Sequence, residues 1–111
     1  MNIVNWLKGC VSSRGKALAL YRKGMARARK HDRQGAIVSY TATIDLPNAP
    51  ADVIAMALYN RALVYVAAGD HQHGIDDLNA VLAMGEMLVN IKTMARQKLA
   101  RIASRTPKGS V

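Results

Sequence analysis

Several residue types that mark other classes of protein are scarce in this chain of 111 residues. It has only three Pro and eight Gly, too few turn signals for an all-β fold. Cys10 is the only cysteine, which excludes an intrachain disulfide and favours a reducing compartment. No apolar run approaches the roughly 18 residues that a membrane-spanning helix needs, and the first residues do not resemble a secretory signal. We therefore expect a cytoplasmic protein.

Acidic residues and large aromatics are also few. The chain has 7 Asp and Glu against 16 Lys and Arg, with no Phe and one Trp. Its apolar half consists mainly of Ala, Leu, Ile, Val and Met, and Ala in particular allows helices to approach closely. Ala, Leu, Met, Arg and Lys are all good helix formers. The composition predicts an all-α protein, long enough for one domain with a modest core.

An internal repeat is the strongest pattern in the sequence. When the chain is shifted by 38 residues, identical residues coincide along two stretches. In the first stretch, the residues that coincide with Ala55, Ala57, Leu58 and Tyr59 are Ala17, Ala19, Leu20 and Tyr21. In the second stretch, those that coincide with Asp70, Gln72 and Ile75 are Asp32, Gln34 and Ile37. The matches recur at equivalent places of two helical patterns, which indicates a repeat architecture.

Each copy is predicted to contain two helices. Apolar residues spaced by three and four predict helices over 14–30 and 53–68, each followed by a shorter helix that ends near Leu46 or Gly85. Asp32 and Asp70 are suitable N-caps for these shorter helices, and Gly69 suits a left-handed turn residue. A fifth helix is expected over 86–104, with an inward stripe formed by Leu88, Ile91, Ala95, Leu99 and Ile102.

This pattern of paired helices, a small residue within the first helix and a Gly-Asp turn resembles the tetratricopeptide repeat, or TPR. The second copy carries the resemblance on Leu58, Asn60, Ala62, Tyr65, Gly69, Asp70, Ile75 and Val81, and the first on Leu20, Gly24, Ala36, Ile37 and Tyr40. It implies antiparallel helix hairpins in a right-handed α-solenoid of about five helices. The expected parts are an N-terminal segment 1–13, repeat one 14–47, repeat two 51–85, a capping helix 86–104 and a flexible tail 105–111.

The chain departs from the family pattern in several ways. TPR copies are about 34 residues long, so we place the extra residues of this repeat in the loop 47–52. Arg27 stands where an aromatic residue is usual, and His31 replaces the turn glycine. Two repeats are also fewer than the three that are usually needed for stability. The missing cover is expected either from the fifth helix or from association of two chains as a homodimer.

In TPR proteins the first helices of the repeats line a concave groove. The resemblance therefore implies a mixed apolar and polar groove for a peptide or a partner helix. Its residues would be Leu18, Tyr21, Met25, Arg29, Met56, Tyr59, Asn60 and Leu63. The competing interpretation is that many of these side chains are buried against neighbouring segments. Some TPR proteins clamp a terminal carboxylate, but only Asn60 matches the clamp positions, so that activity is not expected here.

Positive charge is concentrated in the first and last predicted helices. Lys16, Lys23, Arg27 and Lys30 share one face of the first helix. Such a patch would attract nucleic acid or an acidic protein, although a merely solvated helix face is the simpler interpretation. No aromatic residue lies among these cations to stack on a base, which weakens the case for single-stranded nucleic acid. Binding of a polyanion is therefore the alternative to a protein-binding adaptor or scaffold.

No arrangement of residues indicates catalysis. His71 and His73 lie two residues apart, which places them on different faces of a helix and gives no metal site. Asp76 and Asp77 are expected on a solvated face. Neither a reactive partner for Cys10 nor a phosphate-binding glycine loop is present. We therefore expect a protein that is not an enzyme and that needs no cofactor or metal.

The N-terminal segment carries an apolar stripe if it is helical, formed by Ile3, Trp6, Leu7, Cys10 and Val11. It could dock on the first repeat, lie at a membrane surface or contact a partner. Docking is the simplest of these three interpretations.

Overall fold

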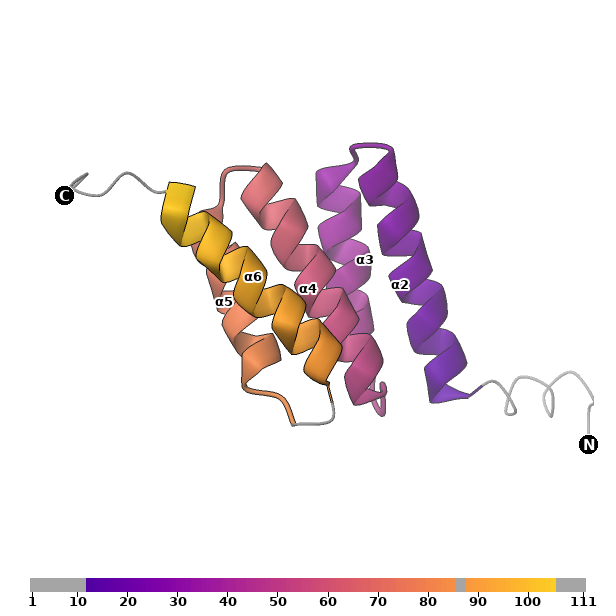
Figure 1. The fold of residues 1–111 in the computed structure, drawn as a ribbon. Coiled ribbons are helices and arrows are strands. Elements are labelled where there is room, and N and C mark those ends of the chain that lie inside the picture. The colour runs from indigo at the N-terminus through magenta and orange to yellow at the C-terminus, as the bar shows by residue number, and fades with distance from the viewer. Residues whose placement is uncertain (1–11, 86–87, 106–111) are drawn as a thin grey trace, which may run out of the picture.

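The computed structural model describes residues 12–85 and 88–105, in which the chain forms five helices joined by turns. The helices are α2 Ser13–Arg29, α3 Arg33–Asp45, α4 Ala51–Ala67, α5 His71–Leu82 and α6 Val89–Arg105 (Figure 1). The all-α prediction is therefore confirmed within these residues. Several boundaries differ from the prediction by one to three residues, and α5 ends at Leu82 rather than near Gly85. Helix α4 begins at Ala51 rather than Val53, and α6 includes Arg105, which the sequence pattern places in the tail.

The start of α4 has a local physical cause. Pro50 occupies the N-cap position, where its fixed φ and its missing N–H cost the helix nothing. Asp52 in the first turn places a negative charge near the positive end of the helix dipole. These two residues allow the helix to begin before the apolar pattern does.

Some predictions fall on residues 1–11, 86–87 and 106–111, which lie outside the described residues. They are the N-terminal apolar stripe with Cys10, the first residues of the capping helix and most of the tail. Within the described residues, none of the helices is both long enough and apolar enough to cross a membrane.

Consecutive helices run in opposite directions and form a stack of hairpins (Figure 1). Helix α4 packs on α3 and α5, which flank it in the sequence, and also on α2 and α6. Helices α2, α4 and α6 therefore form one layer, in which they run in the same direction. Helices α3 and α5 form the other layer, each packed against the helices that precede and follow it.

The two hairpin turns are built alike, 38 residues apart. His31 has a φ of 61° and Gly69 a φ of 87°, so both adopt the left-handed conformation. The following residues, Asp32 and Asp70, each accept a hydrogen bond from the backbone N–H three residues further on, at 3.0 and 3.2 Å. Both predicted N-caps are confirmed. Because a side chain is disfavoured at positive φ, His31 introduces strain where the second repeat has glycine.

Helix α4 contributes to both apolar clusters of the core. Its Ala57 and Val64 pack in a cluster with Tyr40 of α3. Its Leu58 and Ala62 belong to a second cluster, which is completed by Leu78 and Val81 of α5 and by Ala95 and Ile102 of α6. The inward side of α6 is thus the side that the sequence pattern predicts. Since the two clusters meet on α4, this helix joins the two hairpins into one structure.

Gly24 allows α2 to pack closely against α3. A Cβ atom built at Gly24 would lie 2.6 Å from two atoms of the Tyr40 ring, which is only 1% exposed. Burial raises the pKa of Tyr40 to about 12. The small residue that the repeat pattern places within the first helix is therefore required by its aromatic neighbour.

Candidate functional site

A cavity opens on the layer formed by α2, α4 and α6. It encloses about 320 Å³ and is lined by Tyr21, Met56, Tyr59, Asn60, Ile91 and Met94. A second, more open hollow of about 300 Å³ continues from it toward the beginnings of α4 and α6. The two share Met56 and Ile91, so together they form one groove along α4. Apart from Leu88, which precedes α6, its described walls come from α2, α4 and α6.

A hydrogen-bond pair fixes the polar part of the groove. The Asn60 side chain donates one hydrogen bond to the Tyr21 hydroxyl, at 3.0 Å, and another to the backbone carbonyl of Met56, at 2.9 Å. Burial raises the pKa of Tyr21, while the hydrogen bond from Asn60 lowers it, and the net direction is upward. Tyr21 is therefore a neutral hydroxyl at physiological pH. Its oxygen and the Asn60 amide hold α2 and α4 in register.

The structure brings together four of the eight residues that the family resemblance places in the groove. Those four are Tyr21, Met56, Tyr59 and Asn60. Of the other four, Met25 packs against the cluster that contains Tyr40, and Arg29 is exposed at the end of α2. Leu18 and Leu63 are half-buried and are not part of the cavity lining.

Two residues of α6, Ile91 and Met94, complete the cavity although the sequence analysis did not place them in a groove. Met94 is 44% exposed, one of the more exposed large apolar side chains of the described chain. The signal was present in the sequence. If the fifth helix is treated as the first helix of a third repeat, it becomes a third wall of the groove rather than only a cap.

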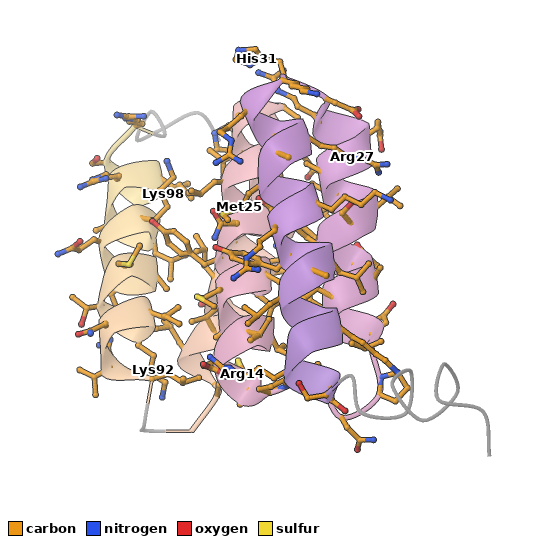
Figure 2. All side chains as sticks on the ribbon, turned by 90° about the vertical axis from the view of Figure 1, so that its right-hand side faces the viewer. Arg14, Met25, Arg27, His31, Lys92 and Lys98 are labelled. Atoms are coloured by element: carbon orange, nitrogen blue, oxygen red, sulfur yellow. The ribbon has the colours of Figure 1, made fainter. Side chains whose placement is uncertain are left out.

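The predicted basic patch is reduced by the packing of Arg27. Its guanidinium donates hydrogen bonds to the Gly35 carbonyl and the Ser39 hydroxyl of α3, both at 3.2 Å. Figure 2 shows Arg27 on the side of α2 that faces away from α6. Lys16 and Lys23 remain exposed on α2, and so does Lys30 at its C-cap. Arg27 therefore helps to pack α2 on α3.

Asp77 is not on a solvated face, which corrects the expectation for Asp76 and Asp77. Asp76 is exposed, but the side chain of Asp77 is only 10% exposed and forms a two-point ion pair with Arg61, at 2.7 and 2.8 Å. Arg61 also donates to the Thr41 hydroxyl at 3.0 Å, and its guanidinium lies 5.8 Å from the centre of the Tyr65 ring. The hydrogen bonds to Asp77 raise the pKa of Arg61. This group joins α3, α4 and α5 behind the groove.

The two histidines of α5 serve the hairpin turn. His73 lies 2.6 Å from an Asp70 carboxylate oxygen and stacks on Tyr65 at a ring distance of 5.1 Å. His71 contacts the Gly69 carbonyl through a ring nitrogen at 3.2 Å. In the part of the chain that the structure describes, no three residues of the metal-binding types converge on one point.

No protein-family profile matches the chain, and no curated protein or solved structure matches it significantly. The function is therefore inferred from the geometry of the groove. Its described cavity offers apolar side chains, two phenols and one amide. These groups can make apolar contacts and hydrogen bonds with a ligand.

Proposed function

We propose that the chain is a TPR-like interaction module, a non-catalytic adaptor that binds a short peptide or a partner helix in the groove. The observation that carries this proposal is the convergence of α2, α4 and α6 on one open cavity. Each helix contributes at least one side chain to it. A groove between helices that presents apolar anchors around a few polar groups is a common mode of peptide recognition.

The internal bonding of the groove supports this proposal. Asn60 is already held by Tyr21 and by the backbone of Met56, so its side chain does not need to be reorganised before a partner binds. Binding to a surface that is already formed loses less conformational entropy. Met56, Met94 and the two tyrosines provide contact area that adapts to different side chains.

Binding of a polyanion to the outer face of α2 is the weaker alternative. The hydrogen bonds of Arg27 to α3 commit one of the four predicted cations to packing. The remaining three lysines are exposed, and exposed charges at low density bind weakly at physiological salt.

A cytoplasmic location, which the single cysteine favours, forms part of the main proposal.

The proposal can be tested with peptides selected on the full chain. A display library of random peptides about 12 residues long supplies the ligands, and calorimetry measures their affinities for variants. Met94→Ala should weaken binding by about fivefold or more, the loss expected when an anchor contact is removed. Val38→Ala is the matched control, because Val38 is 62% exposed on α3, in the other layer.

Tyr59→Ala and Asn60→Ala should also weaken binding. Both residues have structural contacts, Tyr59 with the core and Asn60 with Tyr21, so circular dichroism must show that each variant is folded. The groove assignment is wrong if folded Met94→Ala and Asn60→Ala bind the selected peptides as tightly as the unaltered chain.

A further inference from the structure

Charge is divided between the two layers of the fold. Helices α2, α4 and α6 carry twelve Lys and Arg residues and a single acid, Asp52. In the other layer, α3 and α5 carry one Arg and three Asp, and the N-caps Asp32 and Asp70 add two more. The groove therefore lies on the strongly cationic layer, where Asp52 is in turn paired with Arg14 at 3.0 Å.

Along α6 the side chains change from apolar to basic beyond the described lining of the groove. Ile91, Met94, Lys98, Arg101 and Arg105 are spaced by three and four residues, so they form one stripe. The first two line the cavity, and the last three are basic. Figure 2 shows Met25 of α2 and Lys98 of α6 on the sides of their helices that face one another.

Helix α2 follows the same order. Tyr21 lines the cavity, Met25 lies one turn further on, and Arg29 lies one turn beyond Met25. Because α2 and α6 run in the same direction, Arg29 and the basic half of the α6 stripe lie toward the same end of the groove (Figure 1). Within residues 12–85 and 88–105, neither Arg29, Lys98 nor Arg101 forms an ion pair.

Stabilisation of helix ends does not account for all of these cations. A basic residue in the last turn of a helix interacts favourably with the helix dipole, which explains Arg29 and Arg105. Lys98 lies about two turns before the end of α6, where this effect is weak. The helix dipole therefore does not explain Lys98, which lies one turn beyond the cavity residue Met94.

We infer that the groove takes an acidic amphipathic segment of a partner protein, with apolar side chains on Met56, Ile91 and Met94 and carboxylates toward Lys98 and Arg29. This inference rests on the proposed function and specifies the chemistry of its ligand. A second copy of the chain fits poorly, because with a net charge of +9 it would bring like charges together. Single-stranded RNA matches the cations, but its backbone offers nothing apolar for the methionines and Ile91.

The test selects random peptides of about 12 residues on the full chain and measures binding of the enriched peptides by fluorescence anisotropy. The selected peptides should combine apolar residues with Asp or Glu. Replacing their acids with Asn or Gln should weaken binding about tenfold at low salt, and the difference should shrink at about 0.5 M salt, where charges are screened.

Charge reversal locates the contact. Lys98→Glu should weaken binding of the acidic peptide about tenfold and leave its amide version within about twofold. Lys23→Glu is the control, since it makes the same change of charge at another exposed lysine. Around the axis of α2, Lys23 lies about a third of a turn or more from Tyr21, Met25 and Arg29, so it points away from the groove. An equal loss in both variants would overturn the inference, because the attraction would then come from net charge alone.

The outcomes separate the two proposals. If binding depends on Met94 but the acidic and amide peptides bind equally well, the groove binds peptides and the inference about acidity is wrong. If peptides bind but Met94→Ala has no effect, the proposed function itself fails. A single-stranded RNA of about 12 nucleotides that binds more tightly than every selected peptide and depends on Lys98 would overturn the inference in favour of nucleic acid. Self-association that depends on Met94 in sedimentation would overturn it in favour of a second copy.

Discussion

Removing the Asp77 carboxylate, as in Asp77→Ala, should destabilise the fold by about 3 kcal/mol, because the Arg61 guanidinium would be left without its charged partner. The side chains of Arg61 and Asp77 are only 17% and 10% exposed. Breaking a fully buried pair costs about 3–5 kcal/mol. We take the lower end because Arg61 would keep its hydrogen bond to Thr41 and its contact with Tyr65.

The assay is urea denaturation followed by far-ultraviolet circular dichroism, with melting as a second measure. For a chain of this length, a loss of 3 kcal/mol corresponds to a fall in Tm of about 12 °C. The matched control is Asp76→Ala, which removes the adjacent, exposed carboxylate and should change stability by less than about 0.5 kcal/mol.

A double-mutant cycle identifies the cause. Arg61→Met keeps much of the packing of the side-chain stem and should cost about 2 kcal/mol, since it leaves the Asp77 carboxylate poorly solvated. The double variant Arg61→Met and Asp77→Ala should cost about 2 kcal/mol less than the sum of the single changes. A loss below about 1 kcal/mol for Asp77→Ala, or additivity within about 0.5 kcal/mol, would refute the reasoning.

Further predictions concern the turns and the close contact of α2 with α3. His31→Gly should stabilise the protein by about 1 kcal/mol, because glycine adopts a positive φ without strain. Gly69→Ala should cost about 1 kcal/mol. The cost comes from the positive φ alone, since a Cβ atom at this position would meet nothing within 4 Å. Gly24→Ala should cost about 2 kcal/mol by pressing on the Tyr40 ring, despite its better helix propensity; urea denaturation checks all three, and a gain for Gly24→Ala would contradict this packing. A backbone hydrogen bond lowers the pKa of Asp70 below its ordinary 3.8, so its contribution is fully present above pH 3.8 and is lost as the pH falls further. Asp70→Asn should therefore flatten the acid side of the stability profile, and an unchanged profile would contradict this assignment.

The elements of the fold that depend on local sequence could be predicted. The turns at His31 and Gly69 and the caps Asp32 and Asp70 each depend on a few neighbouring residues, whose types limit the backbone. The helices also follow from the spacing of apolar residues along the chain. A repeat strengthens both kinds of inference, because each position is seen twice.

Contacts between distant residues could not be predicted in the same way. Whether Arg27 extends into solvent or packs on α3 depends on how closely two helices approach and on a carbonyl and a hydroxyl that the first helix does not contain. Asp77 is buried only because Arg61 lies 16 residues earlier on the facing helix. In the candidate site, the structure brings together some of the residues on α2 and α4 that the resemblance placed in the groove. The contribution of Ile91 and Met94 could be recognised only once the position of α6 was known.

The central position of α4 has a consequence for how a bound partner would affect unfolding. In the described residues, α2 and α6 do not pack on each other, and both pack on α4. A linear stack of this kind can unravel from either end independently. A ligand that contacts both α2 and α6 would couple the two ends of the stack. Unfolding of either outer helix would then also release the ligand. Local opening at the ends, seen by amide hydrogen exchange, would then give way to a single all-or-none transition.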